Sequence, residues 1–220
     1  MKAWAVVVAA GGGRRFGGAK QFADLAGRRV VDWSLDVARA ACDGVVLVMP
    51  AEVLATTAVP EGIDAVVAGG PTRSESVRCG LAAVPAGADV IVVHDAARPL
   101  ARIELWQAVI AAVEAGADAA IPAVEVSDTV KQIGERGHLV TLDRSKLVAV
   151  QTPQAFVARV LRQVHAAREE ATDDAALVES AGGRVRLVDS TRDNLKITSR
   201  MDLVVAAALI DARRSEAIPG

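Results

Sequence analysis

The sequence has few aromatic residues. Only 3% of its 220 residues are aromatic, and tyrosine is absent. Proteins that hold single-stranded nucleic acid stack the bases on aromatic side chains, so this shortage argues against that class. The formal net charge of −2 gives no broad basic field that would attract nucleic acid or a membrane surface. We therefore expect no nucleic-acid partner, and positive charge can matter only where it is local.

Cysteines and long apolar runs are also scarce. Cys42 and Cys79 are the two cysteines, they fall in separate predicted helices, and their spacing is not that of a metal site. Their number would allow one disulfide, but we expect the free thiols of a cytosolic protein. No apolar run reaches the ~18–20 residues of a membrane span. A strand is predicted directly after Met1-Lys2, which leaves no room for a signal peptide. We expect a cytoplasmic protein with no membrane partner.

The remaining composition is that of a globular protein, with 52% hydrophobic and 24% charged residues. The length suits one domain, residues 1–220. Short Val-rich runs alternate with amphipathic segments, which predicts an α/β fold: a doubly wound, mainly parallel, Rossmann-like sheet with helices on both faces. We expect strands at residues 4–9, 45–49, 65–68, 90–93, 119–123, 185–188 and 194–197, and we expect residues 147–151 to return to the sheet. We expect helices at 30–41, 103–115 and 156–169, and further helices starting near Thr72, Thr172 and Ser199.

Residues 126–150 follow a different pattern. Short strands are predicted at 129–133 and 139–142, and Gly134-Glu-Arg-Gly137 between them is typical of a hairpin connection. Two strands alone are marginally stable in water, so we expect this β-arm to pack on its own domain or on a second subunit.

A glycine-rich loop follows the first predicted strand. Gly11, Gly12 and Gly13 leave the backbone open to a ligand, and Arg14, Arg15 and Lys20 add positive charge. Backbone donors and cations beyond the carboxyl end of a buried strand suit a polyphosphate. The alternative is an ordinary turn with solvated arginines, but three cations in one loop favour phosphate binding.

Neither common phosphate motif fits this loop. Ala19 occupies the lysine position of the Walker A pattern, and Phe16 stands where the dinucleotide fingerprint needs a small residue. The loop must therefore bind phosphate in another way.

Asp95 follows the predicted strand 90–93, at the sheet edge where doubly wound folds bind ligands. Beside a polyphosphate loop, one carboxylate with phosphate oxygens suits Mg²⁺. The alternative is a surface ion pair with Arg98, which would contribute little. Among the histidines, we expect His94 to make structural hydrogen bonds, His138 to lie at the hairpin tip and His165 to lie on a solvated helix face.

Thr72-Arg-Ser-Glu75 has the spacing of a capping box, in which Thr72 caps a helix and Glu75 reaches back to it. Ser76 would then lie in the first turn of the helix. From the pattern alone it could face solvent or a ligand.

Six motifs together carry a resemblance. Ala9-Ala-Gly-x-Gly-Arg-Arg15, with Lys20-Gln21 after it, resembles the signature loop of nucleotidyltransferases that activate sugar or polyol phosphates. Adding the later motifs, the chain resembles the 2-C-methyl-D-erythritol 4-phosphate cytidylyltransferases of the non-mevalonate isoprenoid pathway over nearly its whole length. These later motifs are His94-Asp-Ala-Ala-Arg-Pro99, Ser127-Asp-Thr-Val-Lys131, Thr141-Leu-Asp-Arg144, Gln151-Thr-Pro-Gln154 and Asp193-Asn-Leu-Lys-Ile-Thr198.

The resemblance implies transfer of CMP from CTP to methylerythritol phosphate with Mg²⁺, and a homodimer with exchanged β-arms. It implies Arg15, Lys20, Arg144 and Lys196 as catalytic residues, and Ala9, Ala10, Gly11, Gly12, Gly13, Gly70 and Ser76 as the nucleotide site. It implies Arg98, Thr129, Arg144, Thr152 and Lys196 as acceptor-binding residues and Asp95 as the metal ligand. Asp193 is expected either to be a second metal ligand or to orient Lys196.

This set of residues needs no general base. A phosphomonoester has a second pKa of ~6 and is already mostly anionic near neutral pH, so positioning and charge neutralisation are enough. Three alternatives stay open. One is a ribitol-5-phosphate cytidylyltransferase and another is a non-catalytic nucleotide-binding regulator. The third is half of a bifunctional pathway enzyme, which the end of the chain after one domain disfavours.

Overall fold

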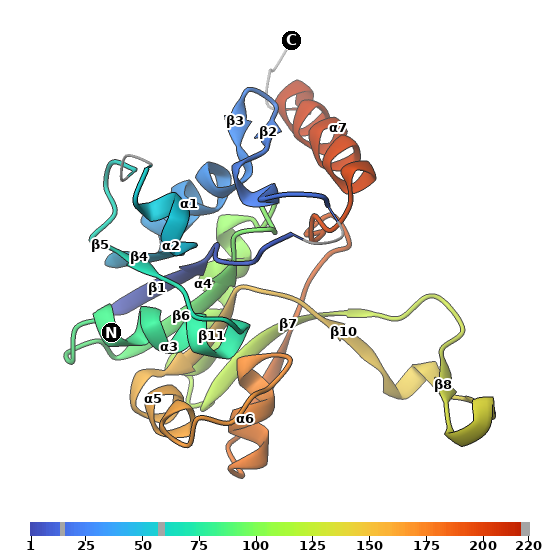
Figure 1. The fold of residues 1–220 in the computed structure, drawn as a ribbon. Coiled ribbons are helices and arrows are strands. Elements are labelled where there is room, and N and C mark those ends of the chain that lie inside the picture. The colour runs from blue at the N-terminus through green and yellow to red at the C-terminus, as the bar shows by residue number, and fades with distance from the viewer. Residues whose placement is uncertain (14–15, 57–59, 217–220) are drawn as a thin grey trace.

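An eight-stranded sheet forms the centre of the molecule (Figure 1). The computed structural model describes residues 1–13, 16–56 and 60–216. The strand order is β10-β7-β11-β6-β1-β4-β5, and β12 pairs with β7. The pairs β1–β4, β1–β6, β4–β5 and β7–β12 are parallel, whereas β10 and β11 run antiparallel to their neighbours. The sheet is thus mainly parallel, as predicted. Its strands are β1 (Ala3–Val8), β4 (Gly44–Met49), β5 (Ala65–Ala68), β6 (Val90–Asp95), β7 (Ala119–Glu125), β10 (Val148–Val150), β11 (Gln154–Val157) and β12 (Val185–Asp189).

Helices cover both faces of the sheet. Successive residues of a strand point to opposite faces, so Ala5 and Val7 of β1 join one apolar cluster and Val6 joins the other. The first cluster includes Leu35 of α1 and Trp106 of α4, and the second includes residues of α3, α5 and α6. The bounds are α1 Val30–Ala41, α3 Arg73–Ala83, α4 Ile103–Glu114, α5 Ala158–Ala166 and α6 Asp174–Ser180.

A third, smaller apolar cluster lies at the end of the molecule that carries the C-terminal helix (Figure 1). There α7 (Arg200–Glu216) packs near the short hairpin of β2 (Asp24–Leu25) and β3 (Arg28–Arg29). Two further short helices lie in the N-terminal part of the chain, η1 (Lys20–Phe22) and α2 (Ala51–Leu54). In the described part of the chain, no helix is both long and apolar enough to cross a membrane. Cys42 and Cys79 are free thiols, as expected.

One predicted helix has different bounds, and one predicted strand is not formed. The helix expected at 156–169 begins only at Ala158, because Phe156 and Val157 belong to β11, where Phe156 is fully buried between β6 and β7. Residues 194–197 do not form a strand. Their backbone contacts the neighbouring loop without a ladder: the N–H of Ile197 donates to the carbonyl of Ala97 at 2.8 Å, and the carbonyl of Asn194 accepts from Arg98 at 2.8 Å.

The β-arm extends away from the body of the molecule (Figure 1). It carries β8 (Lys131–Ile133) and β9 (Leu139–Thr141), with the short turns η2 (Glu135–Gly137) and η3 (Arg144–Lys146). Ile133, Leu139 and Val140 on this hairpin are exposed. After the hairpin the chain returns to the main sheet as β10 (Val148–Val150), as expected for residues 147–151.

A bulge in the sheet shapes the site. Val150 pairs with Ala123 and Ala155 pairs with Ala120, so four residues after β10 pass opposite two residues of β7. The two extra residues must leave the plane of pairing, which is how a β-bulge redirects a side chain. The segment of Thr152 is thereby pushed toward the end of β6, where Asp95 lies.

Candidate active site

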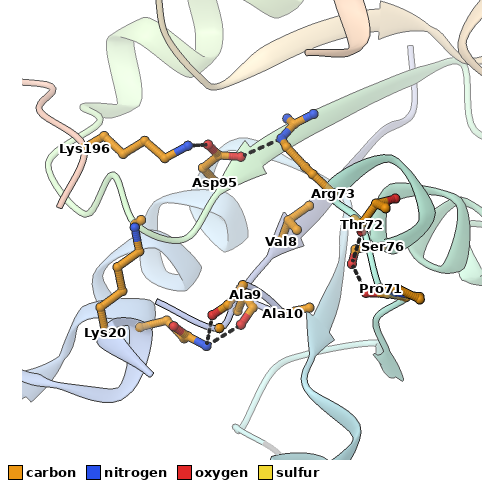
Figure 2. Close-up of a pocket in the computed structure, with 15 residues that line it drawn as sticks. Val8, Ala9, Ala10, Lys20, Pro71, Thr72, Arg73, Ser76, Asp95 and Lys196 are labelled. Carbon is orange, nitrogen blue, oxygen red and sulfur yellow. Dashed lines mark hydrogen bonds and ion pairs between the residues drawn. The ribbon is translucent and has the colours of Figure 1, made fainter. Parts of the chain in front are cut away.

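A pocket of about 270 Å³ opens at the carboxyl ends of β1 and β6. In Figure 2, Lys20 and Lys196 lie on one side of it, Pro71, Thr72 and Ser76 lie on the other, and Ala9 and Ala10 lie between them. The pocket therefore brings together most of the sequence-predicted nucleotide, catalytic and metal residues. Those that line it are Ala9, Ala10, Gly11, Gly12, Lys20, Gly70, Ser76, Asp95 and Lys196.

The glycine-rich loop is held in a tight conformation. Gly13 has a φ of +58°, and its carbonyl accepts the backbone N–H groups of Phe16 at 2.9 Å and Gly17 at 3.0 Å. A Cβ at position 13 would lie 1.9 Å from the carbonyl oxygen of Gly18, so only glycine fits. Gly13 does not line the pocket, and its part is to shape the loop. Arg15, the other predicted catalytic cation of this loop, lies outside the described residues.

Two residues that follow this loop connect it to the rest of the site. The amide of Gln21, which is 2% exposed, donates to the carbonyls of Ala9 at 2.7 Å and Gly11 at 3.3 Å. The ammonium group of Lys20 donates to the carbonyl of Ile197 at 2.6 Å. Lys20 is therefore drawn toward the segment that carries Lys196. Sequence reasoning assigned no role to Gln21, although a buried amide beside a glycine loop has to find backbone partners.

Asp95 lines the pocket between two cations, Lys196 and Arg73 (Figure 2). Its Oδ1 accepts Nε of Arg73 at 3.2 Å, and its Oδ2 accepts Nζ of Lys196 at 2.5 Å. Burial opposes the charged form, but the two cations outweigh it and hold the pKa of Asp95 well below its usual range. Asp95 is therefore a carboxylate throughout the physiological pH range. The alternative surface pair with Arg98 does not form, because Arg98 donates instead to the carbonyl of Asn194 at 2.8 Å.

Sequence reasoning missed Arg73. Its Nη1 also donates to Asp174 Oδ2 at 2.8 Å, so one guanidinium bridges two carboxylates. The signal was its position as the first residue of α3, just after the cap Thr72, where the helix dipole disfavours a cation. A cation there needs carboxylate partners from elsewhere in the chain.

His165 is not on a solvated helix face, which corrects the sequence expectation. It is 3% exposed, and its Nε2 lies 2.9 Å from Oδ1 of Asp174. Because α5 and α6 pack on each other, the side of α5 that carries His165 is covered. His138 is exposed near the hairpin tip, as expected.

Behind Asp95, Thr152 and His94 support the carboxylate. The backbone N–H of Asp95 donates to Oγ1 of Thr152 at 3.0 Å, and this oxygen lies 3.3 Å from Nδ1 of His94. Nε2 of His94 lies 3.2 Å from the carbonyl of Arg98. Burial, the largest cause, lowers the pKa of His94 to about 3, so the ring is neutral and structural, as expected.

A second, smaller cavity of about 90 Å³ adjoins the pocket and shares Arg73, Asp95 and Lys196 with it. Arg98 and Thr152 also line this cavity. Three of the predicted acceptor-binding residues, Arg98, Thr152 and Lys196, are therefore brought together beside Asp95.

The opposite end of the pocket is formed by the start of α3. The predicted capping box is present: Thr72 Oγ1 accepts the N–H of Glu75 at 3.1 Å, and Glu75 accepts the N–H of Thr72 at 3.2 Å. Ser76 is 2% exposed, and its hydroxyl lies 2.9 Å from the carbonyl of Thr72 and 3.3 Å from that of Gly70. Ser76 is thus turned inward and holds the Gly70 turn against the pocket instead of facing solvent.

Three predicted residues lie elsewhere. Thr129 and Arg144 are exposed on the arm, where Arg144 donates to the carbonyl of Ser127. Arg144 lines a different hollow, together with Ser127 and Arg192. Asp193 pairs with Arg213 at 2.6 Å and Arg102 at 3.4 Å. Asp193 does not line the pocket, and its carboxylate pairs with α7 and the start of α4, so in this structure it contacts neither Lys196 nor the metal site proposed at Asp95.

The donor set for a metal in this pocket is one carboxylate. Within residues 1–13, 16–56 and 60–216, no group of three or more His, Cys, Asp or Glu side chains could hold a metal ion. Mg²⁺ is commonly held by one or two carboxylates plus substrate phosphates and water, so Asp95 alone is a sufficient protein ligand when a polyphosphate is bound. The residues present fit such an ion and do not fit an all-protein metal site.

Comparison with known proteins gives a consistent result. The family model of 2-C-methyl-D-erythritol 4-phosphate cytidylyltransferase matches residues 3–212. The protein of that name from Rubrobacter xylanophilus is 44% identical over 219 residues, covering 95% of each chain. The one from Rhodococcus jostii is 43% identical over 214 residues, covering 94% of each chain. The Thermus thermophilus crystal structure of that name has a TM-score of 0.79 at 32% identity, covering 94% of this chain and 98% of the other.

Proposed function

This chain belongs to the 2-C-methyl-D-erythritol 4-phosphate cytidylyltransferase family, and from that we infer its reaction. The enzyme transfers CMP from CTP to 2-C-methyl-D-erythritol 4-phosphate and releases pyrophosphate, giving 4-diphosphocytidyl-2-C-methyl-D-erythritol for isoprenoid precursor synthesis. The observation that carries this inference at the site is one pocket holding a glycine loop, Lys20, Lys196 and the carboxylate of Asp95. These groups suit a triphosphate and a second phosphate at the same place.

We assign the two ends of the nucleotide to the two ends of the pocket. The cytosine lies against Gly70 and Ser76, whose backbone is fixed by the cap of α3. The triphosphate follows the glycine-rich loop, where residues 9–12 line the pocket directly after β1 ends. Pro71 lines the pocket without an N–H, so at that position the base can contact only a carbonyl.

The chemistry is an in-line displacement of pyrophosphate from the α-phosphorus of CTP. The acceptor phosphate is the nucleophile, and because it is already anionic near neutral pH it needs no base. The neutral, buried His94 agrees with that, since it cannot take part in proton transfer from the pocket. Lys20 and Arg15 neutralise charge on the α-phosphate and the leaving group, so catalysis depends on positioning and electrostatics. Mg²⁺ on Asp95 would supply further charge neutralisation on the nucleotide phosphates.

The acceptor lies beside Asp95. Lys196 holds its phosphate, and Arg98 and Thr152 line the adjoining cavity of about 90 Å³. Lys196 pairs with Asp95, and binding of the acceptor exchanges this carboxylate for a phosphate.

Arg144 and Thr129 reach the acceptor from a second copy of the chain. Within one chain they lie on the arm and not at the pocket. The exposed apolar residues Ile133, Leu139 and Val140 give the hairpin a surface that a partner would bury. The enzyme is therefore a homodimer in which each arm completes the other subunit's site. Its location is cytoplasmic.

Pyrophosphate release from CTP and Mg²⁺, with methylerythritol phosphate and ribitol 5-phosphate offered separately, tests the function. We expect turnover with methylerythritol phosphate. Turnover with ribitol 5-phosphate alone would keep the reaction and change the acceptor. CTP binding with no release in either case would favour a nucleotide-binding regulator.

A further inference from the structure

The guanidinium of Arg73 links the central carboxylate of the pocket to a second carboxylate behind it. Nε donates to Asp95, and Nη1 donates to Asp174 at 2.8 Å. Asp95 ends β6 and Asp174 begins α6, so the bridge joins three elements that are distant in sequence. The Arg73 side chain is 23% exposed, and that of Asp174 is 1% exposed. Nη1 of Arg73 is thus held by the buried Asp174, and Nε contacts Asp95 at the ligand site.

Asp174 is itself firmly placed. Its Oδ2 accepts Arg73 and its Oδ1 accepts Nε2 of His165 at 2.9 Å. It stands in the first turn of α6, where the helix dipole favours a carboxylate. Asp174 lines neither the pocket nor the adjoining cavity. Asp174 therefore reaches the pocket through Arg73, which lines both the pocket and the adjoining cavity.

We propose that Arg73 is a positioning residue: anchored by Asp174, it fixes Oδ1 of Asp95 and leaves Oδ2 to exchange Lys196 for the metal–nucleotide complex. This rests on the proposed function, in which Asp95 is the metal ligand. The planar guanidinium suits the task because its donors are set in a rigid fork that can serve two carboxylates at once, whereas a lysine ammonium is a point charge. A carboxylate with one oxygen already fixed loses less freedom when it binds a ligand, and outer partners of this kind tune metal affinity.

The main test variant is Asp174→Asn. It preserves the size of the side chain and removes the charge that anchors Arg73, whereas Arg73→Ala would leave a buried carboxylate unpaired and could fail to fold. Arg73→Lys is the second variant, because it keeps the charge and removes the fork.

Glu170→Gln is the matched control. Arg78, on the same helix as Arg73, donates to Glu170 at 2.7 Å and so joins α3 to the segment just before α6. Neither Arg78 nor Glu170 lines the pocket or the adjoining cavity. The control thus breaks a similar link between the same two regions and leaves Asp95 untouched.

The primary readout is the Mn²⁺ affinity of the enzyme saturated with a non-hydrolysable CTP analogue, measured by titration calorimetry. We expect Asp174→Asn and Arg73→Lys to weaken it about tenfold and to raise the half-saturating Mg²⁺ concentration of the reaction similarly. Glu170→Gln should stay within about twofold of the parent protein. In an Asp95→Asn background, Asp174→Asn should have no further effect, because the two changes act through one contact.

Two results would overturn the proposal. Equal metal affinity in Asp174→Asn and Glu170→Gln would make the bridge purely structural. Weaker binding of the analogue without metal in Arg73→Lys would make Arg73 a direct nucleotide contact. Failure of the proposed function is seen separately, as an absence of pyrophosphate release by the parent enzyme, and the Mn²⁺ comparison does not depend on the acceptor.

Discussion

Gly13→Ala should lower the activity strongly, because the added methyl group would displace the peptide group of Gly18. The added Cβ would lie 1.9 Å from the carbonyl oxygen of Gly18, and this oxygen accepts the N–H of Lys20 at 2.9 Å. Reaching ordinary contact distance requires a shift of about 1.5 Å, and Lys20 is tied to the peptide that must shift. A misplacement of about 1 Å at a reacting group can cost about 100-fold in rate. We therefore expect kcat to fall by about two orders of magnitude.

The matched control is Gly17→Ala. Gly17 has a φ of +83°, so alanine there pays a similar left-handed backbone penalty of roughly 1–2 kcal/mol, but its Cβ would meet nothing within 4 Å. The assays are pyrophosphate release and thermal unfolding of both variants. We expect both variants to lose stability, Gly13→Ala more because it adds the clash with Gly18, and we expect very different values of kcat. Equal values of kcat would refute the argument that the contact between Gly13 and Gly18 places Lys20.

Four further outcomes are expected. Lys20→Ala should lower kcat strongly and leave the unfolding transition in place; near-normal kcat would remove Lys20 from the mechanism. Arg144→Ala should raise the KM for the acceptor more than that for CTP, and an unchanged acceptor KM would contradict its assignment. Removal of divalent metal with EDTA should abolish turnover, which added Mg²⁺ restores; undiminished turnover would exclude Asp95 as an essential metal ligand. The pKa of His94 is about 3 in the folded protein and ~6.5 in the unfolded chain, so the unfolded chain takes up the proton first as the pH falls. The contribution of neutral His94 to the free energy of unfolding is complete above about pH 6.5. It should fall by about 1.4 kcal/mol per pH unit as the pH drops toward 3. A His94→Gln variant with the same urea-unfolding pH dependence as the parent would contradict this.

The sequence predicted the sheet better than the site. Val-rich runs such as those of β1 and β4 are buried on both faces, so their hydrophobicity alone identifies them. β11 was missed because Val157 continues the helical spacing of Val160, Leu161 and Val164 on α5. Only its place between β6 and β7 makes that segment a strand.

The residues of the site that were predicted are those within local motifs. Asp95 and the glycine loop lie at or next to strand ends, and Lys20 follows that loop as the first residue of η1, so position in the fold indicates their use. Arg73 and Asp174 have no such motif, since their contact joins residues 101 apart. Asp193 shows the limit of a local motif: it is close to Lys196 in sequence, but Lys196 pairs with Asp95 and Asp193 pairs with Arg213.

The long reach of these contacts has a consequence for how activity is acquired. Asp95 meets Lys196, and Arg73 meets Asp174, across 101 residues in each case. Closing such long loops has an entropic cost that must be met before the contacts form, so they are expected late in folding. A chain emerging from the ribosome would complete the strands β1, β4, β5 and β6 well before Lys196 was synthesised. In refolding experiments, recovery of CTP turnover should therefore lag behind recovery of the far-ultraviolet circular dichroism signal.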